Sequence, residues 1–290
     1  MTLSYPDFVA GQYRDASNLE ARIALHRRFS TGEKPLPRWI FEQLDLPPDV
    51  RILEIGCGSG PLWSENEERI PDGWTVTLTD ASPGMVGEAR ERLGPDRRMA
   101  FRVAGVRDIP LSDGAFDASI ANHMLYHVPD RPRALAEVAR VLSPGGCLHA
   151  ATNGGGHMRE LGPMRHVLDP SHPSHPATKD PMGFSLENGA AQLSQWLMEV
   201  SLRRYEGALV VTEAAPLIEY LLSGTSADAA VRRAGAGGGP GKAGPRGLAR
   251  EGGDAQEASR RAARRAGCDP DNQGLGPVRG PPATVAPWKS

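Results

Sequence analysis

The chain has 290 residues, of which 39% are apolar, and a formal net charge of -2, so it can build the core of one large domain or two small ones. The charge balance excludes a general attraction to nucleic acid or to an anionic membrane, because phosphate binding needs an excess of Lys and Arg. We expect a globular enzyme with a small-molecule substrate, and the composition leaves its oligomeric state unknown.

The cysteines and the first residues predict a cytoplasmic protein. Cys57, Cys147 and Cys268 are far apart and form no CxxC pair, so neither a zinc site nor a disulfide framework is indicated. Residues 1–10 lack a basic start followed by an apolar core, and no apolar run approaches bilayer length. We therefore expect reduced thiols, no metal and no membrane partner.

The first predicted elements are two helices, over residues 16–29 and 36–44. In the first helix, Leu19, Ile23 and His26 recur on one stripe while charged residues lie elsewhere. This pattern is typical of an amphipathic helix that packs against another part of the protein.

A short apolar run over residues 50–55 predicts a buried strand, and a glycine-rich turn follows it. Gly56, Gly58 and Gly60 allow positive φ and leave room for a ligand to lie against the peptide backbone. Many such turns only join a strand to a helix, so the turn alone does not establish a binding site.

Asp80 supports the interpretation of the glycine-rich turn as part of a binding site. It stands just past a second predicted strand, residues 74–79, and about 20 residues beyond the glycines, where nucleotide sites place a carboxylate for ribose hydroxyls. The dinucleotide pattern would also need a glycine at position 61, and this chain has Pro61. A nicotinamide-dependent dehydrogenase is therefore the least favoured alternative.

Helices and strands alternate through the middle of the chain, as a parallel sheet requires. Ser82 can cap a helix that begins at Pro83, and Asp130 can cap another, which we expect Gly145 and Gly146 to end. The predicted helices span residues 59–69, 83–93 and 131–142, and the predicted strands span residues 100–104, 116–121 and 147–152.

A stretch rich in Gly, Pro and His over residues 153–184 is interpreted as a lid or substrate wall that sets specificity. Within it, His172 and His175 could suggest a metal pair, but the prolines prevent a helical face and no third ligand is evident. After it we expect a helix over residues 185–200, a strand over residues 205–212 and a helix over residues 213–222.

The composition changes abruptly beyond Ser223. Residues 229–290 are dominated by Gly, Ala, Arg and Pro and cannot bury enough apolar surface to offset the entropy of ordering. We expect residues 224–290 to be largely disordered. The tail is either a genuine replacement of an ordered ending or a change of reading frame, which resequencing the gene would decide.

Taken together, four motifs in one order resemble class I S-adenosylmethionine-dependent methyltransferases of the small-molecule, bacterial type. They are Glu54–Gly60, Thr79–Ser82, Ile109–Asp117 and Arg140–Gly146. The resemblance covers roughly residues 10–223 and implies a doubly wound, Rossmann-like α/β fold with a mostly parallel sheet and helices on both faces. The parts would be an N-terminal helical cap (1–48), a methyltransferase domain (49–223) and the tail (224–290), in which the family's final strand is not visible.

The resemblance implies S-adenosylmethionine as the cofactor, held at the tips of neighbouring strands. The residues expected to bind it are Glu54, Gly56, Cys57, Gly58, Gly60, Asp80, Ala81, Met85, Gly105, Val106 and Asn122. The family's usual adenine-binding acid is replaced by Gly105, so we expect the backbone of Gly105 and Val106, helped by Arg107 or Asp108, to meet the base. Met85 matches a position that packs on adenine, with a core methionine as the alternative.

Candidate catalytic residues follow the fourth strand, because ligands gather at the carboxyl ends of parallel strands. His123 and His127 are candidates for a base that takes a proton from a hydroxyl acceptor, with Tyr126 and His157 behind them. Alternatively, His127 only shapes the loop, and a neutral amine acceptor would need no base.

Because the family's N-terminal helices lie over the mouth of the site, the resemblance also suggests contacts to the substrate or the cofactor from Tyr13, Asn18, Arg22 and His26, of which Tyr13, Arg22 and His26 are assigned to the substrate. A solvated arginine and a capping asparagine are the ordinary alternatives. The expected function is methyl transfer to an oxygen or nitrogen of a small molecule, in secondary metabolism. The competing hypothesis is a non-catalytic module of the same fold that holds the cofactor or its product.

Overall fold

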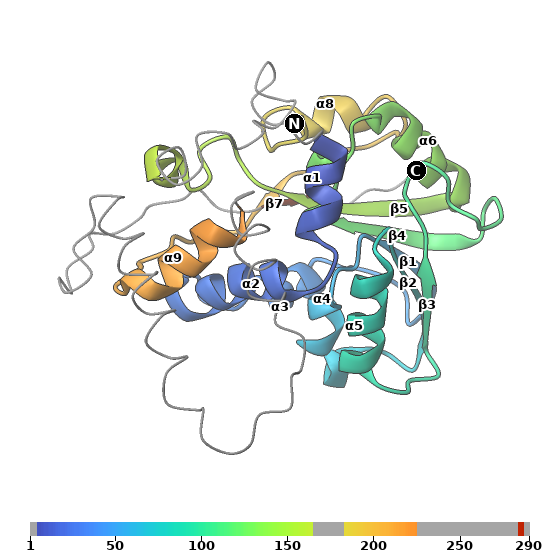
Figure 1. Ribbon diagram of the computed structural model, residues 1–290. Coiled ribbons are helices and arrows are strands. Elements are labelled where there is room, and N and C mark those ends of the chain that lie inside the picture. The colour runs from blue at the N-terminus through green and yellow to red at the C-terminus, as the bar shows by residue number, and fades with distance from the viewer. Residues whose placement is uncertain (1–4, 165–182, 225–283, 287–290) are drawn as a thin grey trace.

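The computed structural model describes residues 5–164, 183–224 and 284–286 (Figure 1). The helices are α1 (Tyr5–Gln12), α2 (Ser17–Phe29), α3 (Leu36–Glu42), α4 (Pro61–Ser64), α5 (Pro83–Leu93), α6 (Arg131–Val141), α8 (Gly189–Leu193) and α9 (Ala214–Ser223), with 3-10 turns η1 (Glu67–Arg69), η2 (Leu125–His127) and η3 (Arg159–Leu161). The strands are β1 (Asp49–Ile55), β2 (Gly73–Asp80), β3 (Met99–Val103), β4 (Phe116–Asn122), β5 (Leu142–Thr152), β6 (Arg203–Arg204) and β7 (Thr284–Ala286). No helix in these ranges is long and apolar enough to cross a membrane.

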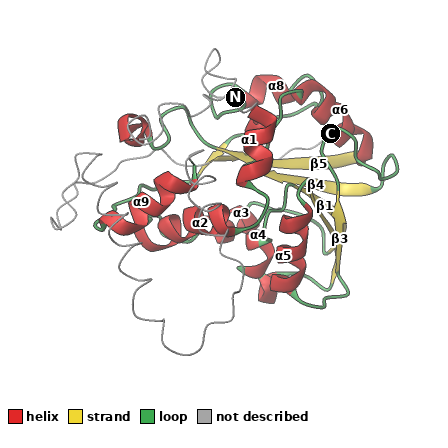
Figure 2. Ribbon diagram, viewed as in Figure 1, coloured by secondary structure: helices red, strands yellow, loops and turns green. Residues whose placement is uncertain are grey.

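Five parallel strands, yellow in Figure 2, form the body of the sheet, and their order is β3-β2-β1-β4-β5. The chain winds outward from β1 to β3 and then crosses back to β4, so the order reverses between β1 and β4. Such a reversal leaves a crevice at the carboxyl ends of the strands, where α/β proteins bind ligands. The predicted doubly wound fold is confirmed.

Apolar side chains of β1 alternate between two hydrophobic layers, one on each face of the sheet. On β1, Val50 and Ile52 belong to a cluster with Trp63 of α4, while Leu53 and Ile55 belong to the cluster of α6. This alternation is the consequence of the period of two along a strand, and it explains why the buried run in β1 is almost continuous.

The N-terminal helices close one side of the molecule. Helix α2 lies beside α9, as Figure 1 shows, and its Leu25 and Phe29 pack in a third hydrophobic cluster with Leu217 and Leu221. An adjacent side of α2 carries the predicted stripe with Leu19 and its neighbours, which faces a cavity and not the sheet. The additional helix α1 precedes α2 and was not predicted.

One predicted helix is broken. Residues 59–69 contain the short α4 and the turn η1, separated near Asn66. The side-chain amide of Asn66 donates to the carbonyl oxygens of Leu62 at 2.7 Å and of Pro37 at 3.2 Å. Such a side chain competes with the helical backbone for carbonyl partners, so the helix does not continue through it.

Several predictions for the later chain need correction. Helix α8 covers only part of residues 185–200, and residues 205–212 form no strand, because Leu209 makes a single antiparallel bridge with Ser30 in place of a ladder. Gly145 and Gly146 do not end α6, which stops at Val141, and they lie inside β5. The central part of the predicted lid, including His172 and His175, lies outside the described residues.

Beyond β5 the sheet continues with two short strands. Strand β7 pairs antiparallel with β5 through residues 150–152, and β6 pairs antiparallel with β7. A short antiparallel strand therefore completes this edge, although the sequence pattern of the tail did not reveal one. The rest of the predicted disordered tail lies outside the described residues.

Candidate functional site

A cavity of about 1140 Å³ opens at the carboxyl ends of the strands, between the sheet and the N-terminal helices. It unites most of the predicted site residues: Glu54, Gly56, Cys57, Gly58, Asp80, Ala81, Gly105, Val106 and Asn122 from the cofactor set, His123 and His127 from the catalytic set, and Tyr13, Arg22, His26, Tyr126 and His157 from the substrate set. The cavity therefore lies where the strand order predicts a ligand site.

Gly60 and Met85, two predicted cofactor residues, do not line the cavity. Gly60 has a φ of 78° and stands at the start of α4, so it shapes the turn. Met85 is 0% exposed, which fits the alternative of a core methionine. Asn18, a further substrate candidate, also lies away from the cavity and donates its side-chain amide to the carbonyl of Gln12 at 3.2 Å.

The glycine turn and Asp80 form one hydrogen-bonded unit. Gly56 and Gly58 have φ values of 69° and 55°, a conformation that side chains strain. The backbone N–H of Gly58 donates to Oδ2 of Asp80 at 3.1 Å, and the N–H of Ser82 donates to Oδ1 at 2.8 Å. Burial raises the pKa of Asp80, while these two donors favour its charged form. Each carboxylate oxygen keeps capacity for a further hydrogen bond from a ligand.

Glu54 is a buried carboxyl group in the floor of the cavity. The indole N–H of Trp63 donates to its Oε2 at 2.6 Å, and the amide of Asn122 donates to Oε1 at 3.4 Å. Burial raises the pKa of Glu54 to about 8, although both donors act in the opposite direction. A cationic ligand in the cavity would favour the charged form of this group.

Strand β4 ends in two side chains with unused polar atoms. Oδ1 of Asn122 and Nε2 of His123 are buried and have no hydrogen-bond partner among the described residues. His123 has a φ of 52°, which is uncommon for a residue with a side chain and is often found at functional sites. Burial lowers the pKa of His123 to about 4, so its imidazole is neutral at physiological pH.

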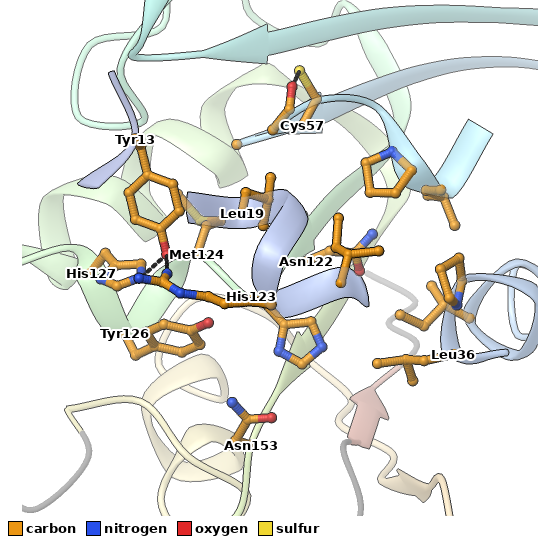
Figure 3. A pocket seen from close by; sticks show the side chains of 18 of the residues that line it. Tyr13, Leu19, Leu36, Cys57, Asn122, His123, Met124, Tyr126, His127 and Asn153 are labelled. Carbon is orange, nitrogen blue, oxygen red and sulfur yellow. Dashed lines mark hydrogen bonds between the residues drawn. The ribbon is translucent and has the colours of Figure 1, made fainter. Parts of the chain in front are cut away.

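Tyr13 and His127 lie on one side of the cavity, opposite Leu36 (Figure 3), and Arg22 joins them in a hydrogen-bonded chain. The Tyr13 hydroxyl lies 2.9 Å from Nε2 of His127, and Nη1 of Arg22 donates to the same hydroxyl at 3.0 Å. Because Arg22 can only donate, the arrangement that satisfies every group has Tyr13 donating its proton to His127. Burial raises the pKa of Tyr13, and Arg22 opposes that shift.

Two further histidines meet across the cavity. The rings of His26 and His157 stack with centroids 5.9 Å apart, and burial lowers the pKa of His26. His26 comes from α2 and His157 from the loop after β5, so the stack joins the cap to the body of the domain. A neutral imidazole can both donate and accept a hydrogen bond.

The expected adenine side is formed by the turn after β3. Gly105, Val106 and Arg107 line the cavity, whereas Asp108 does not and instead donates its backbone N–H to the carbonyl of Gly105 at 3.2 Å. The turn therefore offers backbone groups beside the cavity, as expected from the missing acid.

The sequence did not reveal the wall on the other side of the cavity. Residues 30–37 and 205–209 contribute to it, although they are far apart along the chain. The hydroxyl of Tyr205 donates to the carbonyl of Lys34 at 2.7 Å, and the N–H of Thr31 donates to the carbonyl of Ala208 at 2.9 Å. No periodic signal could have predicted this wall, because tertiary contacts form it.

Among the described residues no cluster of His, Cys, Asp or Glu could hold a metal.

Comparison with known proteins agrees with this geometry. Residues 53–150 match the family described as methyltransferase domain. The chain is 33% identical over 159 residues to a malonyl-acyl-carrier-protein O-methyltransferase of Serratia marcescens, covering 54% of this chain and 56% of the relative. It is 38% identical over 116 residues to a ubiquinone biosynthesis O-methyltransferase of Xanthomonas oryzae, covering 39% of this chain and 47% of the relative.

The chain spans about half the length of the curated relatives it matches. A crystal structure of the cyclase SpnF shares the fold, with a TM-score of 0.57 and 17% identity over 100% of this chain and 97% of that one. The family match, the strand order and the relatives agree on the type of domain. Over residues 53–150 the chain is similar to methyltransferase domains, and its strand order is that of the predicted doubly wound fold.

Proposed function

We propose that the protein transfers a methyl group from S-adenosylmethionine to an oxygen or nitrogen atom of a small-molecule acceptor. The observation that carries the proposal is the hydrogen bond between the glycine turn and Asp80. It holds a carboxylate suited to ribose beside a stretch of backbone that a ligand can approach closely. The two O-methyltransferase relatives favour oxygen as the acceptor atom.

The residues present fit the cofactor at both of its polar ends. Asp80 would accept from the ribose hydroxyls, and the orphaned Oδ1 of Asn122, next to Glu54, would accept from the amino group of the methionine part. The backbone of Gly105 and Val106 would meet the adenine. When bound, the cofactor supplies a methyl group that is already electrophilic because it is attached to a sulfonium.

The protein's own contribution is alignment and proton handling. Holding the acceptor in line and away from water can remove on the order of 7 to 11 kcal/mol of barrier. Neutral His123 has a free Nε2 that can accept a hydrogen bond from a hydroxyl acceptor, and His127 can hold a proton passed through Tyr13. Proton transfer through His123 or His127 stays a prediction.

Isothermal titration of the full chain with S-adenosylmethionine and with S-adenosylhomocysteine tests the cofactor assignment. Asp80→Ala should weaken binding about tenfold or more, since it removes charge-assisted hydrogen bonds to the ribose. Asp72→Ala is the matched control, because Asp72 is exposed just before the opposite end of β2. Absence of binding to the unaltered chain would reject the proposal.

A non-catalytic binding module of the same fold remains the alternative. The fold hosts other chemistry, as the cyclase SpnF illustrates, so the fold alone does not establish methyl transfer. Incubation with methyl-labelled cofactor and a panel of hydroxyl and amine acceptors separates the two functions. Labelled product supports the enzyme, and tight binding without transfer to any acceptor supports the module.

A further inference from the structure

Helix α2 leads from the glycine turn to the far wall of the cavity. Its first turn rests on the glycine turn: a Cβ at Gly58 would lie 2.9 Å from the Leu19 side chain, and the hydroxyl of Ser59 donates to Glu20 at 2.9 Å. The end of α2 reaches the wall of residues 205–209, through the bridge between residues 30 and 209. His26 follows Leu19 by two turns, about 10 Å along the helix axis, so it stands toward that wall.

The neighbours of His26 come from parts of the chain that do not contribute to the glycine turn. Its ring stacks on His157 of the loop after β5, and it meets the ring of Tyr220 in α9 edge-on, with centroids 6.3 Å apart. His26 lines the cavity, and its side chain makes no hydrogen bond with another described residue. Burial lowers the pKa of His26, so the ring is a neutral imidazole with one donor and one acceptor to offer.

His26 also lies near the end of β4, where the candidate base stands. Its imidazole adds to burial in lowering the pKa of His123. The preceding side chain, Asn122, is directed to Glu54 at 3.4 Å, and so toward the proposed cofactor. A group held by His26 would therefore lie beside His123, on the side of the cavity away from the glycine turn.

This end of the cavity offers no buried counter-charge among the described residues. Three charged groups of the lining, Glu54, Asp80 and Arg22, stand at the strand tips or one turn of α2 from the residues on the glycine turn. Glu65 directly follows α4, and Lys34 pairs with Glu42 at 2.6 Å. The remaining charged residues of the lining are exposed: Arg14, Arg27, Glu33 and Arg107. An ion beside His26 would lose hydration without meeting an opposite charge, which is costly.

Building on the proposed function, we propose that His26 selects the methyl acceptor by hydrogen-bonding an uncharged hydroxyl group at this end of the cavity. The acceptor class is an alcohol or a phenol that is neutral at physiological pH, and carboxylates and ammonium compounds are rejected. Ile23, Leu36 and Leu209 line the same cavity, so the hydroxyl would be attached to an apolar body. A hydroxyl suits a neutral imidazole because it can donate to one tautomer and accept from the other.

The test uses the full chain saturated with S-adenosylhomocysteine and four probes of similar shape: naphthol, naphthalene, naphthoate and naphthylmethylamine. At neutral pH naphthol is uncharged, and its fluorescence reports its own binding and its displacement by the others. Naphthol should bind about fivefold more tightly than naphthalene, the effect of one hydrogen bond between neutral groups. It should bind at least about tenfold more tightly than either charged probe, because those probes lose hydration.

His26→Phe keeps a ring to stack on His157 and removes both nitrogens. It should lower the affinity for naphthol to that for naphthalene and leave the affinity for naphthalene unchanged. His26→Gln, which can again donate and accept, should restore part of the preference. Arg28→Gln is the matched control on α2, because Arg28 is exposed and pairs with Glu213 at the surface. An unaltered affinity for S-adenosylhomocysteine establishes that each variant is folded.

The unaltered chain decides the acceptor class even if a variant fails to fold. Binding of naphthoate or of the amine as tightly as naphthol, or no binding of naphthol, would show that the inference is wrong. A preference for naphthol over naphthalene that survives in folded His26→Phe would remove His26 from the assignment. Failure of the unaltered chain to bind S-adenosylhomocysteine would instead overturn the proposed function.

Discussion

At the scale of single residues, the buried carboxyl group of Glu54 makes stability depend on pH. The folded state raises the pKa of Glu54 from the ordinary value of 4.5 to about 8, mainly through burial. Below about pH 4.5 the group is protonated in both states, so it has no effect. As the pH rises to about 8, the unfolded chain releases the proton and the folded chain retains it, so the folded state loses stability.

Glu54→Gln should therefore gain stability relative to the unaltered chain as the pH rises from about 4.5 to 8. Each pKa unit corresponds to about 1.36 kcal/mol, which sets an upper value of about 5 kcal/mol for the full shift. Glutamine keeps an oxygen for the indole N–H of Trp63. Urea unfolding at several pH values measures the difference, and parallel curves for the two proteins would contradict the expectation.

Residue types with a strict local requirement were predictable. Positive φ at Gly56 and Gly58 follows from the turn that a glycine-rich motif makes after a strand, and Asp80 follows from its place after the next strand. The neutral state of His123 was not predictable, because burial causes it and burial depends on elements packed around the end of β4.

At the scale of elements, the approach of the cap to α5 depends on one glycine. A Cβ at Gly84 would overlap the carbonyl oxygen of Arg14, in the turn between α1 and α2, whereas a Cβ at Gly87 meets nothing within 4 Å. The two glycines lie on the same helix. They form a matched pair that separates close packing from helix propensity.

Gly84→Ala should destabilise the contact between the cap and α5 and speed hydrogen exchange of the amides in α1 and the turn after it. Gly87→Ala should instead stabilise the protein, by up to about 1 kcal/mol, since alanine is the better helix former. Exchange measured by mass spectrometry, together with urea unfolding, checks both. Equal effects of the two substitutions would show that the cap does not depend on this contact.

Helices with local start signals were predicted well, because a cap acts within one turn. The hydroxyl of Ser82 accepts from the N–H of Met85 at 3.3 Å, and Asp130 accepts from the N–H of Arg133 at 3.2 Å, at the starts of α5 and α6. The broken helix after the glycine turn was missed. The side-chain amide of Asn66 in this segment donates to the carbonyl oxygen of Pro37, and no local sequence pattern predicts that contact.

At the scale of the whole molecule, the cavity is enclosed by parts of the chain that lie more than 150 residues apart. Tyr205 is 9% exposed, its ring lies 5.5 Å from that of Trp39, and its hydroxyl donates to the carbonyl of Lys34. It joins the segment after α2 to the segment before α9 across the wall of the cavity.

Tyr205→Ala should cost about 3 to 5 kcal/mol of unfolding free energy, as for other buried aromatic side chains. Tyr205→Phe removes only the hydrogen bond and should cost about 1 kcal/mol. Urea unfolding measures both losses of stability. Equal losses for the two variants would contradict the expectation that the buried ring contributes more than the hydroxyl.

The sequence by itself determined the central sheet, the glycine turn, the position of Asp80 and the family resemblance, because alternating apolar residues, capping side chains and motif spacing act over short distances along the chain. Only the tertiary structure decided the rest of the site. It brought α1, α2 and residues 205–209 over the strand tips and paired Tyr13 with Arg22 and His127. Those features depend on which distant segments come to share one cavity, and on how far that cavity excludes water from its charges.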